Sequence, residues 1–284
     1  MVGPASANSG QSAARAWRPA ISGIREVFHA RFADHAYPPH THDAWTLFIV
    51  DEGAIHYDLE RRGHIAAPSM VTALPPFIAH DGRPATRDGF AMRVLYLDPA
   101  VVGEDAIGHA VDEPVVRVPG LRRRIDRLHR TLGSATDPLE AEVSLAGIAE
   151  DLRAAFRPGR PTIEASDIER PDVLAEALRA FLEAHLTESV TIAAAAEELG
   201  GSPTGLARSF ARAFGIPPHA WLLGRRLELA RERIVGGAAL ADVAAELGFA
   251  DQAHLTRRFG QWFGATPAAI RRDPGPKGGA RRKG

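Results

Sequence analysis

The sequence predicts a mixed α+β protein: a small β-barrel of the jelly-roll type, then a pair of helices, then an all-α C-terminal region. Three observations predict this organisation. Short apolar runs separated by turn residues fill roughly residues 24–99, apolar residues at helical spacing follow Pro119, and a helix–turn–helix pattern occurs twice near the C-terminus. At 284 residues the chain is long enough for two domains of ordinary size.

Composition and charge are those of a globular protein, with 45% apolar and 24% charged residues. From Pro171 onward there are 15 Lys and Arg against 12 Asp and Glu, whereas the preceding part has 19 against 23. A mildly basic C-terminal half fits a polyanionic partner. The absence of cysteine excludes disulfides, thiolate zinc sites and a cysteine nucleophile.

The first 20 residues lack the apolar segment of a secretory signal, and no stretch approaches the ~20 apolar residues of a membrane span. We therefore interpret residues 1–20 as a disordered lead-in and expect a cytoplasmic protein that does not contact membranes.

The barrel and its helical pair are assigned to residues 21–156. Four apolar runs are the clearest strands, and Asp51-Glu52-Gly53 predicts a hairpin turn between the first two. These runs are Trp45–Val50, Ile55–Leu59, Met70–Leu74 and Met92–Leu97.

After Pro119 the apolar spacing changes to that of helices. One helix is predicted from Leu121 to Leu132, and a second from Leu139 to Phe156. Residues 157–171 carry prolines and charges without apolar periodicity, which is typical of a linker. Residues 273–284 form a basic tail, rich in glycine and proline, that we expect to be disordered.

The segment Leu240–Gly264 predicts two short helices joined by a tight turn. Gly248 interrupts the apolar pattern of the first helix, where a left-handed residue would end it. Asp251 can cap the second helix, whose apolar face holds Leu255, Phe259 and Phe263. The other face is polar and basic, which suits base edges and phosphates. The alternative is an ordinary helical hairpin with a solvated basic face.

A second copy of this pattern favours the helix-turn-helix interpretation. The segment Ile192–Gly215 repeats the Glu-Leu-Gly turn and the Leu-Phe-Phe spacing of the later segment. Ser202 and Pro203 supply an N-cap and a first-turn proline. A longer helix is expected between the two copies, from Pro218 to Gly236.

Residues 172–272 resemble the AraC/XylS family of bacterial transcription factors. The resemblance rests on an ordered set of motifs, among them Ala207-Arg208-Ser209-Phe210, Trp221-Leu222, Gly248-Phe249 and Phe263-Gly264. The family implies two helix-turn-helix units held by one long helix, so that both enter successive major-groove segments of DNA. Carried over onto this sequence, the DNA-binding residues are Thr204, Ala207, Arg208, Arg212, Gln252, Ala253, His254, Thr256 and Arg257.

The N-terminal half resembles the cupin-like sensing barrel found in many such regulators. The matching residues are Pro39-His40-Thr41-His42, Gly53, and Pro75-Pro76 with His80. Thr46 stands where metal-binding cupins have a Glu, and Phe77 stands where their second motif has a Gly. Three neutral imidazoles could still hold zinc or iron. The alternative, that the histidines hydrogen-bond within a pocket, is favoured by the missing acid, and no cofactor is expected.

In this interpretation the barrel encloses a small organic effector. The pocket residues are His40, His42, Trp45, Thr46 and His80, with Phe48, His56, Tyr57, Arg93 and Tyr96 as further candidates.

The resemblance implies double-stranded DNA, the effector, a second copy of the chain and RNA polymerase as partners. One alternative is a metal-dependent cupin enzyme with an accessory helical domain. Another is a DNA-binding protein whose barrel only dimerises. No catalytic residue is assigned.

Overall fold

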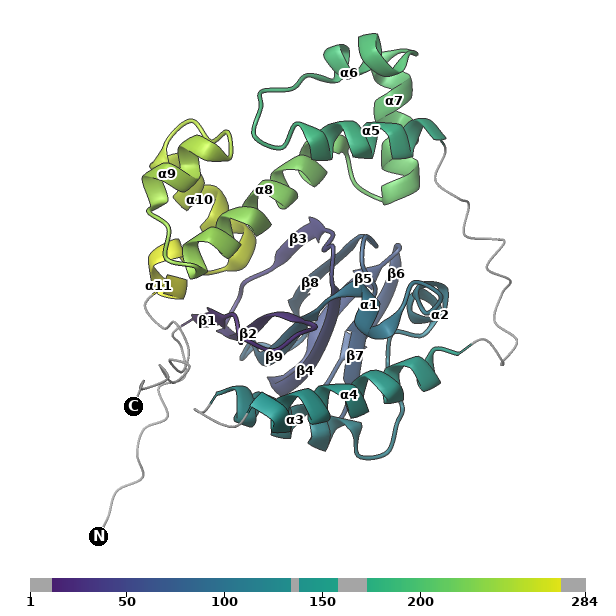
Figure 1. Ribbon diagram of the computed structural model, residues 1–284, viewed down its shortest axis with the longest axis vertical. Coiled ribbons are helices and arrows are strands. Elements are labelled where there is room, and N and C mark those ends of the chain that lie inside the picture. Colours follow the sequence, from purple (N-terminus) through teal and green to yellow (C-terminus); the bar gives the residue numbers. More distant parts are fainter. Residues whose placement is uncertain (1–11, 134–137, 158–172, 272–284) are drawn as a thin grey trace, which may run out of the picture.

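The computed structural model describes residues 12–133, 138–157 and 173–271. Figure 1 shows a β-barrel with one long helix, α8, lying across it and a group of shorter helices at each end of α8. The expected linker (157–171), except for its first residue Arg157, and the expected tail (273–284) lie outside the described residues. No helix in the described ranges combines the length and apolar character that crossing a bilayer requires.

Two antiparallel sheets form the barrel, which confirms the predicted fold class. The larger sheet has the order β1-β2-β9-β4-β7, with bounds Ala13–Trp17, Ile24–Phe32, Phe90–Leu97, Trp45–Gly53 and Val71–Leu74. The smaller sheet has the order β3-β8-β5-β6, with bounds Tyr37–His40, His80–Pro84, Ile55–Leu59 and Arg62–Ala66.

Alternation along β4 separates two cores, because successive side chains of a strand point to opposite faces. Phe48 and Val50 face the interior between the sheets. Trp45, Leu47 and Ile49 face outward into a second core, which the helices after the barrel cover. Both faces of this strand are therefore buried, which explains why its sequence is a continuous apolar run rather than an alternating one.

Two expectations for the N-terminal region differ from the structure. The hairpin predicted at Asp51-Glu52-Gly53 is wrong, because β4 pairs with β7 and β9 whereas β5 pairs with β6 and β8. The chain instead crosses between sheets at Gly53, which has a φ of 69°. The lead-in assigned to residues 1–20 contains β1, which pairs with β2 and buries Trp17.

Helices after the barrel begin with the short α1 (Pro99–Val102) and α2 (Ile107–Asp112). The predicted pair follows as α3 (Leu121–Leu132) and α4 (Pro138–Ala155), which lie together under the larger sheet in Figure 1. Their apolar residues complete the second core, where Phe156 stacks on Trp45 with ring centroids 5.8 Å apart.

The C-terminal region contains seven helices among the described residues. They are α5 (Val173–Ala184), α6 (Ile192–Leu199), α7 (Pro203–Phe214), α8 (Pro218–Val235), α9 (Leu240–Glu246), α10 (Gln252–Phe263) and α11 (Pro267–Arg271). The local signals act as predicted: Ser202 accepts from the Gly205 amide, and Asp251 accepts from the His254 amide. Gly248 is left-handed, with a φ of 71°.

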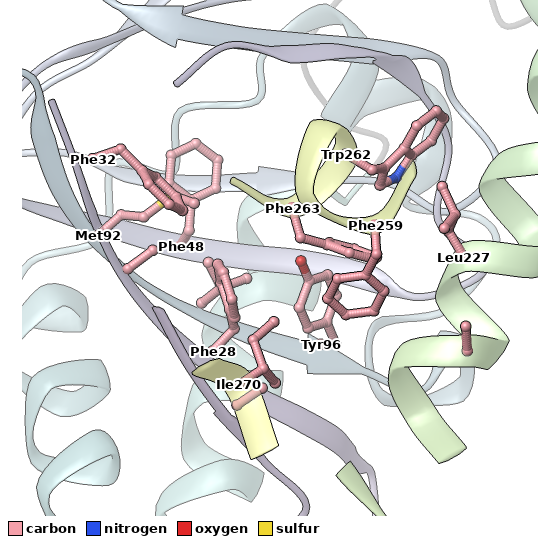
Figure 2. Packing of buried hydrophobic residues seen from close by; sticks show 14 of the residues in the cluster. Phe28, Phe32, Phe48, Met92, Tyr96, Leu227, Phe259, Trp262, Phe263 and Ile270 are labelled. Atoms are coloured by element: carbon pink, nitrogen blue, oxygen red, sulfur yellow. The ribbon is translucent and has the colours of Figure 1, made fainter. Parts of the chain in front are cut away.

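The second helix-turn-helix unit shares its apolar core with the barrel. Figure 2 shows Phe259, Phe263 and Ile270 gathered with Phe28 and Tyr96 of the barrel, and all five residues are buried in one cluster. The first unit has a separate core, formed mainly by α5, α6 and α7. The barrel is therefore packed tightly against α8 and α10, and the two halves of the chain are not independent bodies.

Candidate nucleic-acid interface and histidine site

The polar faces of α7 and α10 lie on the surface of the C-terminal helices. Thr204, Arg208 and Arg212 are exposed on α7, and Ala207 is half-buried. On α10, Gln252, Ala253 and Arg257 are exposed, and Thr256 and His254 are half-buried. Within the described parts of the chain, neither Arg208 nor Arg257 takes part in an ion pair. Two guanidinium groups are thus available, one on each helix, for phosphates or guanine edges.

Packing orients the polar faces outward. Leu206 and Phe210 on α7, and Leu255 and Phe259 on α10, are almost completely buried and fix the rotation of each helix. His254 is turned partly toward the protein. Its ring contacts Phe249, and its Nδ1 lies 3.4 Å from the Ala250 amide nitrogen. It helps to set the turn between α9 and α10, so it offers less free surface than Gln252.

Three buried histidines meet inside the barrel near its junction with the C-terminal helices. His40 ends β3, His42 follows in the next loop, and His80 begins β8 opposite His40. Each ring offers a nitrogen, and these three nitrogens all lie within 4.8 Å of one another. The sequence placed all three residues in one pocket, and the structure brings them together.

Hydrogen bonds fix the tautomers of these rings. The Nδ1 of His40 lies 2.7 Å from the Pro38 carbonyl oxygen, and the Nδ1 of His80 lies 3.0 Å from that of Ile78. The Nδ1 of His42 pairs with the carboxylate of Glu228 on α8. Because a carbonyl oxygen only accepts, the Nδ1 atoms of His40 and His80 carry a proton, which leaves the Nε2 atom of each of these two rings for another partner.

Burial keeps two of the imidazoles neutral. Desolvation, assisted by the neighbouring histidines, lowers the pKa of His40 well below its usual value. The same causes lower the pKa of His80 to about 3. Both rings are therefore unprotonated at Nε2 around neutral pH and can act as acceptors or ligands.

The two departures from the cupin pattern have clear structural positions. Thr46 points into the barrel, and its buried hydroxyl has no hydrogen-bond partner among the described residues. Phe77 has a φ of 65°, so it keeps the left-handed backbone for which a glycine is suited. Its amide donates to the His42 carbonyl at 2.7 Å, which ties the two histidine-bearing loops together.

Some predicted pocket residues lie elsewhere. Trp45 is on the opposite face of β4 and packs in the second core, away from the histidines. Arg93 pairs with Asp51 and with Asp126 of α3. Tyr96 does lie in the pocket region, with its ring centroid 5.1 Å from that of His42.

Two further candidates, Phe48 and Tyr57, belong to the barrel core, with ring centroids 6.1 Å apart. His56 is half-buried on β5, where alternation places it on the face opposite Tyr57.

Sequence reasoning missed an ion-pair network that joins the halves of the chain. Arg225 of α8 lies 2.6 Å from Glu228, 3.0 Å from Glu183 of α5 and 3.2 Å from Asp43 of the barrel. These carboxylates raise the pKa of Arg225 against the opposing effect of its burial. The only sequence signal was an apolar helix face interrupted by Arg225 and Arg231.

Arg231 makes the more deeply buried contact of the junction. Its Nη2 lies 3.0 Å from Glu26 Oε1, and both side chains are at most 7% exposed. Its guanidinium also lies over the rings of Phe263, Tyr96 and Phe28, 4.7–5.5 Å from their centroids. Burial raises the pKa of Glu26, and the Arg231 charge opposes that shift.

A charged cleft of about 80 Å³ opens between the barrel and α8. Its lining includes four arginines, four acids, His42 and Tyr96. The charged lining residues are Arg18, Arg25, Arg225, Arg231, Glu26, Asp43, Glu228 and Glu232. The cleft is smaller than the roughly 300–1,000 Å³ that drug-sized ligands occupy.

Comparison with known families separates the chain into the same two halves. The model of the AraC-like ligand binding domain matches residues 23–149, and a helix-turn-helix domain model matches residues 195–273. The HTH-type transcriptional regulator YbfI of Bacillus subtilis, itself uncharacterised, is 26% identical over 239 residues, or 81% of this chain and 85% of YbfI.

The chain is also similar to a second regulator in part of its sequence and to a solved structure in its fold. The virulence regulon transcriptional activator VirF of Yersinia enterocolitica is 31% identical over 97 residues, which are 34% of this chain and 36% of VirF. The crystal structure of unsaturated fatty acid-bound ToxT of Vibrio cholerae superposes with a TM-score of 0.51 at 12% identity, covering 92% of this chain and 95% of ToxT.

Proposed function

Because the chain belongs to the AraC family of helix-turn-helix transcriptional regulators, we propose that it reads duplex DNA with α7 and α10 and adjusts that binding to an effector held by the barrel. It is a DNA-binding regulator with an N-terminal ligand-binding domain, and not an enzyme. The observation that carries the proposed reading mode is the pair of capped helices with free guanidinium groups at Arg208 and Arg257.

The base-reading residues of the proposal lie near the start of each second helix. Arg257 and Arg208 suit guanine O6 and N7, Gln252 suits adenine, and Thr256 and Thr204 suit a base edge or a thymine methyl. Arg212, one turn after Arg208, suits a phosphate. Ala207 and Ala253 leave space for close approach of the helices to the groove.

Exchange of Arg257 for alanine tests this assignment. We expect specific binding to weaken by roughly 1–3 kcal/mol and the preference at one base position to relax, because one bidentate contact is lost. Binding would be measured by fluorescence anisotropy on a selected duplex and on its single-base variants. Arg87→Ala, at an exposed position between β8 and β9, is the matched control and should leave binding unchanged. A uniform loss across all sequence variants would contradict base reading by Arg257.

The effector side of the proposal rests on the barrel. ToxT, which shares the fold, is bound to an unsaturated fatty acid in its crystal structure, and this supports a sensing role for the same architecture. The chemistry of the effector must come from residues of this chain, namely His40, His42 and His80 with Thr46 and Tyr96 beside them. Trp45 is not included, because it faces the second core.

We further propose a homodimer formed through α4, contact with RNA polymerase, and a cytoplasmic location. Leu139 and Val143 are 61% and 64% exposed one turn apart on α4, which supports a helix-to-helix contact. The polymerase contact and the location rest on the family's role in transcription.

A further inference from the structure

We propose that His40, His42 and His80 bind one divalent transition-metal ion of the Zn²⁺ class, and that α8 and α10 sense its presence. The regulatory part of this proposal rests on the proposed function, in which the barrel adjusts DNA binding. The metal-binding part stands on the geometry of the three histidines alone.

The ligand set fits such an ion. Three imidazole nitrogens within 4.8 Å of one another come from two facing strands, β3 and β8, and from the loop that follows β3. Zinc holds imidazole nitrogens at about 2.0–2.1 Å, so ligands in a tetrahedron lie roughly 3.4 Å apart. Small ring rotations would close that difference and leave a fourth position for water or an organic ligand.

The outer hydrogen bonds are those of metal-binding histidines. A ligating imidazole ordinarily donates its second ring N–H to a carbonyl or carboxylate, which fixes the ring and its tautomer. His40 and His80 do so to the carbonyls of Pro38 and Ile78, and His42 does so to Glu228. Because each Nδ1 is engaged in this way, the Nε2 atom of each ring is the nitrogen that remains for a metal ion.

Glu228 brings a carboxylate to the histidines from a distant part of the sequence, in a different role from the Glu ligand that is missing at Thr46. It does not replace a ligand but accepts from His42, 186 residues earlier in the chain. A metal ion at Nε2 would polarise the ring and strengthen its Nδ1–H donation to this carboxylate. Metal binding would therefore stabilise the contact between the barrel and α8.

Two of the three ligands touch the DNA-binding half. His42 contacts Glu228 of α8, and the ring centroid of His40 lies 5.6 Å from that of Trp262 at the end of α10. Arg225 extends the first contact from Glu228 to α5. The position of both helix-turn-helix units is thus linked to the geometry of the histidines.

The guanidinium groups of the junction are paired with carboxylates, so they do not oppose a bound cation as free charges. The ion pairs join six carboxylates to four guanidinium groups: Glu26, Asp43, Asp98, Glu183, Glu228 and Glu232 with Arg18, Arg25, Arg225 and Arg231. Of these carboxylates, Glu228 contacts His42 directly, so one negative charge lies beside the histidines. Arg231, which would oppose a nearby metal ion, is already paired with Glu26.

Metal titration of the untagged, chelator-stripped full chain tests the site. We expect one Zn²⁺ per chain, and Co²⁺ should develop visible d–d absorption characteristic of nitrogen ligation. Glu228→Gln should weaken Zn²⁺ binding by about 10–100-fold, the usual effect of losing an outer partner, and His80→Ala should weaken it more. His219→Ala removes an exposed histidine of α8 and should change nothing.

Anisotropy on a selected duplex tests the regulatory part. Saturating Zn²⁺ should change the DNA affinity of the wild type by about 5–150-fold, and Glu228→Gln should lose that response while still binding DNA. No stoichiometric metal, or Co²⁺ bands that survive His80→Ala, would overturn the site. Bound metal without any change in DNA affinity would overturn the regulatory part. Failure to bind any selected duplex, with or without metal, would instead contradict the proposed function.

Discussion

Exchange of Arg231 for alanine is expected to lower the free energy of unfolding by about 3–5 kcal/mol. The substitution leaves the Glu26 carboxylate buried without a counter-charge, since both side chains are at most 7% exposed. It also removes a guanidinium that lies over the rings of Phe263 and Tyr96. Denaturant unfolding followed by circular dichroism measures the loss.

Arg233→Ala on the same helix is the matched control. Arg233 pairs with Glu246, but the two side chains are 49% and 51% exposed, so the loss should stay below about 1 kcal/mol. The double substitution Glu26→Gln with Arg231→Met should recover much of the stability, because no unpaired charge remains. Equal losses for Arg231→Ala and Arg233→Ala would contradict the buried junction.

Exchange of Phe259 for alanine is expected to cost about 3–5 kcal/mol of stability by leaving a cavity in the core. The side chain is fully buried, and its ring centroid lies 4.6 Å from that of Phe263. Thermal and denaturant unfolding measure the loss, and DNA binding should fall only as the folded fraction falls.

Gln261→Ala, at an exposed position two residues further along α10, is the control and should unfold like the wild type. Arg257→Ala should likewise keep its stability while losing base specificity. If Phe259→Ala kept full stability yet lost DNA binding, the assignment of the inner and outer faces of α10 would be wrong.

Local signals made the helical region predictable. The caps at Ser202 and Asp251 and the left-handed Gly248 act within a few residues, so the sequence alone contains the information. The strand runs were recognisable for the same reason. The partner of β4 was not, because Asp51-Glu52-Gly53 looks like a hairpin turn whether the next strand pairs in the same sheet or in the other one.

The junction between the halves could not be predicted, because its contacts join residues far apart in the sequence. Glu26 meets Arg231, and His42 meets Glu228, only after the barrel docks on α8. The missing acid at Thr46 argued against a metal, and nothing in the sequence indicated that a carboxylate from α8 would pair with His42. Spacing within one motif carries no information about such a partner.

The reading of DNA by two linked units is the central claim, and hydroxyl-radical footprinting of the full chain on a selected duplex tests it most directly. The full chain is required because the core of the second unit continues into the barrel. We predict protection of two major-groove segments about one helical turn, 10–10.5 bp, apart, with affinity falling steeply as salt rises. Protection confined to a single groove segment would contradict the claim.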